Sequence, residues 1–221
     1  IFRVRSLTSA DLILMLLGAG MNSMFYFASL YTQAILGYDP LKAGLAFLPV
    51  SVGIIVGAVA AQQLIGRVGV RAVGTAGLMI ATAGMILLTG ITPAGTSLGS
   101  LLIGLGPLSI GIGLTFVPIT LLATANVSDE DAGLASGLYN SSQQIGGALG
   151  LAILSTLAAD KTTSALMVLG RAPAAADRAA ATVDGFQVAF IGGAIALGLA
   201  AILMRSLIRP SDVDSIDPTT P

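Results

Sequence analysis

The chain of 221 residues contains no cysteine and no histidine. Without cysteine there is no disulfide bond and no thiolate metal site, and histidine is both the commonest metal ligand and the usual proton carrier at neutral pH. These two absences exclude intramembrane metalloproteases and serine proteases that depend on a histidine. We therefore expect no metal site, no cofactor and no catalytic residue in this chain.

Charged residues are also scarce. They make up 10% of the sequence, whereas hydrophobic residues make up 55% and the mean hydropathy is +0.93. Such a composition cannot cover a water-soluble surface of ordinary polarity, so lipid is expected to be the main solvent of the chain. The net charge of −1 gives no basis for binding nucleic acid.

What the sequence has instead is a series of six long apolar stretches, and all ten basic and eleven acidic residues lie outside them. The stretches are Leu12 to Leu36, Ala43 to Ile65, Ala72 to Ile91, Leu98 to Ala125, Ala132 to Ala159 and Gly185 to Met204. Each has at least the roughly 20 residues that an α-helix needs to cross about 30 Å of hydrocarbon. They lack the alternating polarity of a membrane strand. The predicted fold class is all-α, an integral membrane bundle of six helices.

The positions of the charges predict how this bundle is oriented. If the N-terminus is cytoplasmic, six basic residues lie inside and four outside, which the positive-inside rule favours. The inside residues are Arg3, Arg5, Arg67, Arg71, Arg205 and Arg209, and the outside residues are Lys42, Lys161, Arg171 and Arg178. Three of the outside charges share the connection from Asp160 to Asp184, whose Ala-rich run is compatible with a short surface helix.

The same reading divides the chain into two parts. We expect residues 1–209 to form the six-helix bundle, and residues 210–221, with three Asp and three Pro, to be a disordered cytoplasmic tail. Because the first residue is Ile1 rather than Met, we also expect the chain to be a piece of a longer protein.

Two polar stripes interrupt the apolar stretches. One, in the first stretch, comprises Asn22, Tyr26, Ser29 and Gln33. The other, in the fifth stretch, comprises Ser136, Asn140, Gln143 and Gln144. Spacings of three and four put such residues on one side of a helix, and amides are costly in hydrocarbon unless they find partners. The stripes therefore serve either as hydrogen bonds between helices or as contacts to an organic ligand, for which the Tyr26 ring is suited.

Glycine and proline mark close packing and flexibility. Three glycine pairs at the spacing that lets helix backbones approach closely are Gly53 with Gly57, Gly133 with Gly137, and Gly146 with Gly150. The fourth stretch contains Pro107 and Pro118, which interrupt its backbone hydrogen bonding twice. That helix is expected to bend or flex, as a packing kink or as a deformable gate.

Longer motifs resemble a known family. The most characteristic are Leu36-Gly37-Tyr38-Asp39-Pro40-Leu41-Lys42-Ala43-Gly44 with Leu48-Pro49, then Phe116-Val117-Pro118-Ile119-Thr120, then the segment from Asp131 to Asn140 with the segment from Gln143 to Gly150. With them the chain resembles, over nearly its whole length, the C-terminal half of a major facilitator superfamily transporter, closest to the 14-span drug:proton antiporters. The loop that holds Arg67, Gly69 and Arg71 is similar to the superfamily's cytoplasmic loop motif, although Gly66 stands where that motif has its Asp.

This resemblance implies a different position in the transporter for each pair of spans. Spans one and four would line a central cavity, two and five would meet the N-terminal half of the same transporter, and three and six would face the lipid bilayer. The cavity would be lined by Asn22, Tyr26, Ser29, Gln33 and Thr115. Interface and gating roles would fall to Ser136, Asn140, Gln143, Gln144, Pro107 and Pro118.

The activity that the resemblance implies is export of small amphipathic organic compounds across the bacterial cytoplasmic membrane, driven by the proton gradient. No Asp or Glu lies within a predicted span, and Asp11 lies only at a border. The carboxylate that titrates during transport is therefore expected in the N-terminal half.

Several other functions are alternatives to multidrug export. An exporter dedicated to one metabolite or to a self-made antibiotic would use the same fold. A water channel of the aquaporin type would carry paired Asn-Pro-Ala motifs, and the sequence has none. Enzyme chemistry would need a nucleophile with a base inside the spans. A non-transporting membrane subunit remains an alternative, because a fold does not by itself fix a function.

Overall fold

The computed structural model describes residues 5–94, 98–124, 132–169 and 171–208. These residues form helices over all six predicted stretches, so the predicted fold class is confirmed. The predicted tail, residues 210–221, lies outside the described residues, as do Arg3, Arg209 and the acidic residues 129–131.

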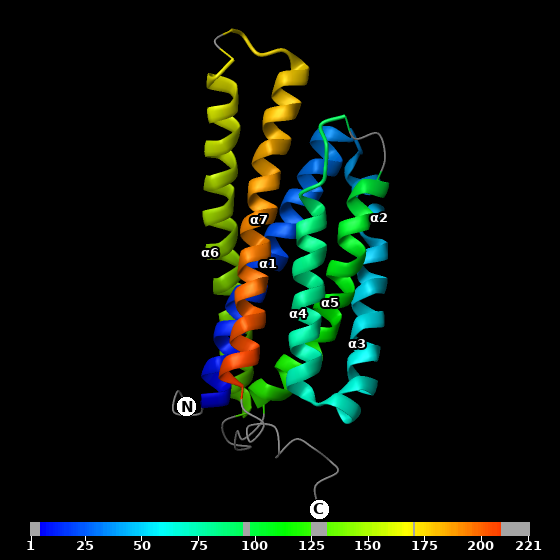
Figure 1. Ribbon diagram of the computed structural model, residues 1–221, viewed down its shortest axis with the longest axis vertical. Helices are drawn as coiled ribbons and strands as arrows, with labels where there is room; N and C mark the ends of the chain where they lie inside the picture. The colour runs from blue at the N-terminus through cyan, green and yellow to red at the C-terminus, as the bar shows by residue number, and fades with distance from the viewer. Residues whose placement is uncertain (1–4, 95–97, 125–131, 170, 209–221) are drawn as a thin grey trace, which may run out of the picture.

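The helices are those labelled in Figure 1, together with one short π-helix. Their bounds are α1 Arg5–Leu30, the π-helix η1 Tyr31–Ile35, α2 Pro40–Ala46, α3 Leu48–Val68, α4 Val70–Leu88, α5 Gly99–Thr124, α6 Ala132–Met167 and α7 Ala175–Leu207. Five stretches are long and apolar enough to cross a membrane: Thr8–Ile35, Pro40–Val68, Val70–Leu88, Gly99–Ala123 and Ala175–Leu207. Helix α6 is not among them; its first half contains the amides of Asn140, Gln143 and Gln144, and its second half contains Asp160 and Lys161.

The first two spans are each divided in two. In the first, α1 passes into η1, where the Leu36 N–H donates to the Tyr31 carbonyl at 3.1 Å in the wider π pattern. In the second, Asp39 accepts a hydrogen bond from the Lys42 N–H at 2.9 Å and starts α2. Helix α3 then begins afresh at Leu48, since Pro49 has no N–H to continue the ladder of α2.

The last two helices are longer than the sequence predicted. Helix α6 continues to Met167, beyond the predicted end at Ala159, and α7 begins at Ala175, well before the predicted Gly185. Alanine has the highest helix propensity, and the first proline after α6 begins is Pro173. The connection from 160 to 184 is therefore mostly a continuation of the two helices, and this hairpin rises above the ends of the other helices in Figure 1.

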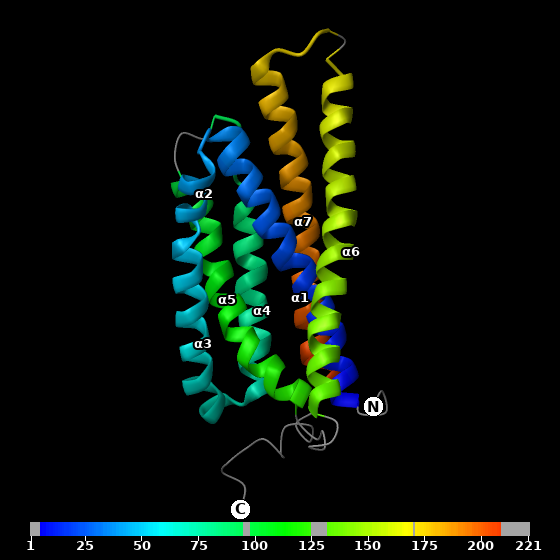
Figure 2. The same ribbon diagram turned by 180° about the vertical axis from the view of Figure 1, so that it is seen from behind.

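The packing order explains which surfaces remain open. Helix α1 packs mainly on α6 and α7, α5 packs mainly on α4 and α3, and α4 joins the two groups through α7. Helices α4 and α7 lie on the face seen in Figure 1, and α1 crosses the opposite face seen in Figure 2. A large hydrophobic core lies between them, with Leu14, Leu78, Met85 and Phe190 among its fully buried side chains, and Ala61, Val73 and Leu114 form a second, small cluster.

Candidate functional site

The first polar stripe belongs to α1, the helix that crosses the face seen in Figure 2, and to η1, which follows it. Tyr26 is 44% exposed, Gln33 is exposed, and Asn22 and Ser29 are half-buried. The Tyr26 ring stands edge-on to Phe27, with ring centroids 5.2 Å apart, so its position is fixed by a buried neighbour. The structure thus presents an aromatic ring and amides together on the surface of an otherwise apolar membrane helix.

Two of these residues bind each other. The Gln33 side-chain amide donates to the Ser29 hydroxyl at 2.9 Å and also approaches the Ser29 carbonyl at 3.4 Å. This pair lies where α1 changes into the π-helix, a feature that is frequent at functional sites. The pair keeps polar groups on the exposed side of the helix and ties them to one another.

Asn22 lies at the contact between α1 and α6. A methyl group added at Gly147 of α6 would fall on the Asn22 side-chain amide, so the glycine leaves the space that the amide occupies. The same helix pair brings Gly146 against the Met15 backbone and Gly150 against Ala19. The predicted close-packing pair Gly146 and Gly150 is thereby placed in the α1–α6 interface.

The polar stripe of α6 is divided between two directions. The Gln143 side-chain nitrogen is buried and has no hydrogen-bond partner among the described residues, and the neighbouring Ser142 is buried as well. Ser136, Asn140 and Gln144 are exposed. The Asn140 amide donates to the Ser136 carbonyl at 3.0 Å within the helix.

A small pocket of about 130 Å³ lies beside Ser136 and Asn140, between α5 and α6. Its other polar lining residues are Thr120 and Tyr139, whose hydroxyl oxygens are 3.4 Å apart. Sequence reasoning singled out Ser136 and Asn140 but missed Tyr139. Tyr139 could have been predicted from its position directly before Asn140, a residue of the polar stripe.

Thr115 is not on either polar surface. It is fully buried, its hydroxyl donates to the Gly111 carbonyl at 2.7 Å, and it faces Gly77 of α4. Spacing along α5 alone did not show which side of the helix α4 would cover. We therefore do not include Thr115 among the residues of the exposed site.

The predicted gate residues lie in a continuous helix. Helix α5 runs through both Pro107 and Pro118 without a break, and its last turns incline towards the start of α6 in Figure 2. Pro118 is buried near Gly74 of α4. The two missing N–H donors are therefore accommodated within the helix, and whether it flexes there stays a prediction.

The loop motif connects α3 to α4. Gly69 has a φ of +85°, a backbone conformation that favours glycine, and this allows the tight reversal between the two helices. Arg67 is exposed in the last turn of α3. Arg71 donates to the Arg205 carbonyl at 2.6 Å, which supplies a donor to the last turn of α7.

Asp11 is an acidic residue near the start of α1. It lies within α1 and within the apolar stretch Thr8–Ile35, and it is only 7% exposed. Its carboxylate faces Ser142 of α6, and neither oxygen reaches a hydrogen-bond donor at normal distance among the described residues. Asp11 is the fourth residue of that stretch, so it stays near the border, and α1, which begins at Arg5, places it against α6.

Together these features define a multi-pass membrane protein with an exposed polar and aromatic surface on its α1 face. Residues 1–151 match the Major Facilitator Superfamily, and the chain belongs to that family of membrane transporters.

Curated relatives agree with this assignment. Over 192 residues the chain is 37% identical to the puromycin resistance protein of Streptomyces alboniger, which covers 86% of the chain and 38% of the relative. It is 34% identical to a cephamycin export protein of Amycolatopsis lactamdurans, over 69% of the chain and 32% of the relative. A multidrug resistance protein of Mycobacterium tuberculosis is 31% identical over 62% of the chain and 25% of the relative. The chain thus spans less than two fifths of the length of these relatives.

Proposed function

We propose that this chain is the C-terminal half of a 14-span drug:proton antiporter that exports amphipathic organic compounds by alternating access. The observation that carries the proposal is the exposed stripe of α1, where Tyr26 and the Asn22 and Gln33 amides lie on a membrane helix. Amphipathic compounds need both an apolar contact surface and a few polar partners, and this surface offers both. The relatives named for antibiotic resistance and export support the same activity.

Exposed apolar side chains indicate where the other half would bind. On α3 the side chains of Val52, Ile55 and Val59 are at least half exposed, and on α6 those of Leu149 and Ile153 are. Gly133 and Gly137 of α6 have no atom of the described chain near their Cβ positions. These two helices flank the α1 face, so a second bundle docked on them would close a cavity over Tyr26.

In this proposal, the stripe of α1 contacts the substrate, while the exposed Ser136, Asn140 and Gln144 of α6 contact the N-terminal half as the two bundles rock. Helix α5 would flex at its two prolines. The proton gradient would supply the energy, with the main titrating carboxylate in the N-terminal half. The protein would lie in the bacterial cytoplasmic membrane, with no cofactor and no enzymatic step.

The second candidate is an exporter dedicated to one compound. It is favoured by relatives whose names specify a single antibiotic, puromycin or cephamycin. The two candidates differ in breadth: a multidrug exporter expels a lipophilic dye, whereas a dedicated exporter protects only against its own compound.

The proposal is tested by dye efflux from drug-sensitive bacterial cells that express the full-length parent gene. We expect efflux above the vector control that a protonophore abolishes. Replacing both Asn22→Ala and Tyr26→Ala should lower efflux about tenfold at equal expression, because roughly 1.4 kcal/mol of contact energy corresponds to that factor.

The matched control replaces exposed side chains on the opposite face, Ile80→Ala with Leu199→Ala, and should leave efflux unchanged. Unchanged efflux in the Asn22 and Tyr26 variant would remove the stripe from the substrate site. Absence of dye efflux with resistance to a single antibiotic would identify the dedicated exporter.

A further inference from the structure

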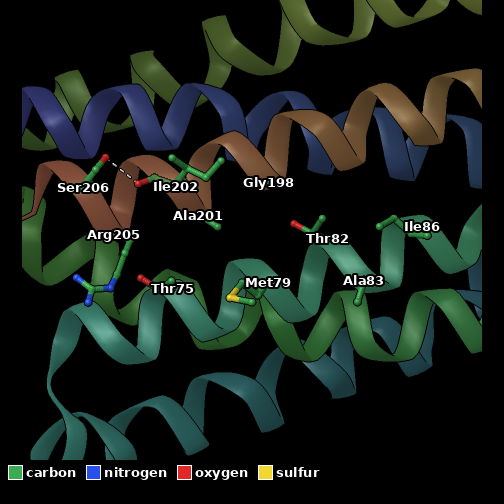
Figure 3. Close-up of a pocket in the computed structure, with 10 residues that line it drawn as sticks. All are labelled: Thr75, Met79, Thr82, Ala83, Ile86, Gly198, Ala201, Ile202, Arg205 and Ser206. Carbon is green, nitrogen blue, oxygen red and sulfur yellow. Dashed lines mark hydrogen bonds between the residues drawn. The ribbon is translucent and has the colours of Figure 1, made fainter.

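A groove runs between α4 and α7, the two helices on the face seen in Figure 1, whereas α1 crosses the opposite face. Its volume is about 540 Å³, and Figure 3 shows the ten residues that line it. Arg205 and Thr75 lie at one end, and Ile86 lies at the other. The groove exists because α7 presents the small residues Gly198 and Ala201 to it.

The walls of this groove offer almost no free polar group. Thr75 and Thr82 donate their hydroxyls to carbonyls of their own helix, of Arg71 at 2.8 Å and Leu78 at 2.7 Å. Ser206 does the same to the Ile202 carbonyl at 2.8 Å. With these hydroxyls turned back onto the helices, the surface left for an occupant is methyl and methylene groups. Its chemistry matches a hydrocarbon chain.

The groove is largely apolar at its exposed rim. The exposed side chains of Met79, Ile86 and Ile202 line it, and Arg205 and Ser206 are exposed at one end. No Asn or Gln is exposed on these two helices among the described residues, in contrast to α1 and α6. A membrane surface without amides is the kind that contacts acyl chains.

One end of the groove carries positive charge. Arg205 is exposed, and Arg71 lies next to it, because its side chain donates to the Arg205 carbonyl at 2.6 Å. Neither guanidinium forms an ion pair with an acidic residue in the described part of the chain. Arg67 adds a third positive charge at the same end of the bundle. The Arg205 guanidinium is therefore available to an anion, at the end that the positive-inside rule places at the cytoplasm.

The length of the groove matches one leaflet of a bilayer. From Thr75 to Ile86 the helix rises by about 16 Å, at about 1.5 Å per residue. Half of a hydrocarbon core of about 30 Å is about 15 Å. We propose that the groove binds one acyl chain of an anionic phospholipid from the cytoplasmic leaflet, with the lipid phosphate beside Arg205 and the charge of Arg71 behind it.

The test is native mass spectrometry of the full-length transporter, released from detergent micelles that contain equal amounts of phosphatidylglycerol and phosphatidylcholine with the same acyl chains. We expect retained phosphatidylglycerol to exceed phosphatidylcholine, and Arg205→Gln to reduce this preference about fivefold, the effect of one basic residue on an anionic lipid. Arg205→Lys keeps the charge and should keep the preference. Arg67→Gln, at the same end but outside the groove, is the matched control and should change it little.

A second variant tests the acyl-chain part of the site. Gly198→Leu fills the floor of the groove, where the nearest atom to an added Cβ is the Thr82 methyl group at 3.8 Å. It should reduce retention of both lipids, whereas Ala76→Leu, exposed on α4 outside the groove, should not. If Gly198→Leu does not elute as a single species, Ala83→Leu fills the groove from its exposed rim.

Three results would overturn the proposal. Equal retention of both lipids by the unmodified protein would leave an unselective apolar surface. Equal effects of Arg205→Gln and Arg67→Gln would place the anion elsewhere. Full lipid retention with a filled groove would show that the acyl chain lies outside it. None of these results depends on which compound the transporter exports.

Discussion

Asn22 shows how one polar side chain is held in an apolar helix. Its amide occupies the space that Gly147 leaves by having no side chain, so the contact needs a particular residue on each helix. Gln143 lies in the same interface, where the nitrogen of its side chain has no partner in the described part of the chain. A buried donor without an acceptor lowers the stability of the fold. We expect this amide to find an acceptor in another conformation of the transport cycle.

Asp11 is a second polar side chain that is buried in α1. A carboxylate that is buried without a donor destabilises the fold if it is charged. We expect Asp11→Asn, which has the same shape and no charge, to raise the free energy of unfolding by about 1 kcal/mol. A higher melting temperature of the purified full-length transporter would show this.

The same variant locates the proton carrier. If the titrating carboxylate lies in the N-terminal half, Asp11→Asn keeps protonophore-sensitive efflux within about twofold, since less than about 0.5 kcal/mol of transition-state energy is lost. A loss of more than tenfold at normal expression, restored by Asp11→Glu, would instead assign proton transfer to Asp11.

At the scale of helices, small residues decide how closely α3 and α5 approach. Gly53 of α3 lies against the Ser109 side chain, and Gly57 lies against the Ile110 carbonyl and the Gly113 backbone. Gly113 in turn lies against the Ile54 carbonyl of α3. The two helices therefore touch through their backbones, which any larger residue at Gly57 would prevent.

Gly57→Ala tests this contact. An added methyl group would fall on the Ile110 carbonyl oxygen and 2.9 Å from the Leu114 nitrogen, so the helices must separate. We expect a loss of about 1 to 3 kcal/mol of stability, seen as a lower melting temperature.

The matched control lies in the same helix. Gly66 has no atom within 4 Å of an added Cβ, so Gly66→Ala should be neutral or stabilising by about 0.5 to 1 kcal/mol, the helix preference of alanine over glycine. Similar melting temperatures for the two variants would show that α3 and α5 are not held by this close approach.

The effect of a proline depends on its position within the helix. Pro49 lies in the first turn of α3, where a missing N–H costs nothing within that helix. Pro107 and Pro118 lie inside α5, and each leaves a carbonyl of the preceding turn without its donor. The predicted kink or gate thus has a physical cause at two defined points, although its role in transport stays a prediction.

At the scale of the whole molecule, the charged residues of the described chain separate to the two ends of the bundle. Arg67, Arg71 and Arg205 lie at the end where α3 meets α4 and where α7 ends. The opposite end carries the α6–α7 hairpin, where Arg171 forms an ion pair with Asp177 at 2.8 Å. Asp177 also accepts a hydrogen bond from the Ala174 N–H at 2.8 Å and so caps the start of α7.

This separation predicts the membrane topology. Because the chain contains no cysteine, single cysteines can be introduced at either end of the bundle, with any cysteines elsewhere in the parent protein replaced. Val168 in the hairpin is 86% exposed, and Val68 at the end of α3 is 56% exposed. In intact cells, a membrane-impermeant maleimide should label Val168→Cys at once and Val68→Cys only after the cells are permeabilised. The reverse pattern would invert the predicted orientation.

Composition and short motifs were enough to predict an all-α membrane bundle, the approximate positions of its six apolar stretches and a resemblance to the Major Facilitator Superfamily. These features depend on composition over windows of about 20 residues and on short motifs. They can therefore be predicted without knowing which segments contact one another in the fold. Tyr26 and Gln33 could be placed on one helix face by spacing alone, and the structure leaves both exposed.

Which residues a neighbouring helix covers could be seen only in the folded bundle. Helix α4 covers Thr115, and α6 covers Asp11, which no spacing within α5 or α1 could reveal. Packing of α6 on α7 accompanies the continuation of both helices beyond their apolar parts, and the gap between α4 and α7 forms the groove at Arg205. Which side of each residue is buried follows from contacts between segments far apart in the chain, and only the folded bundle brings those segments together.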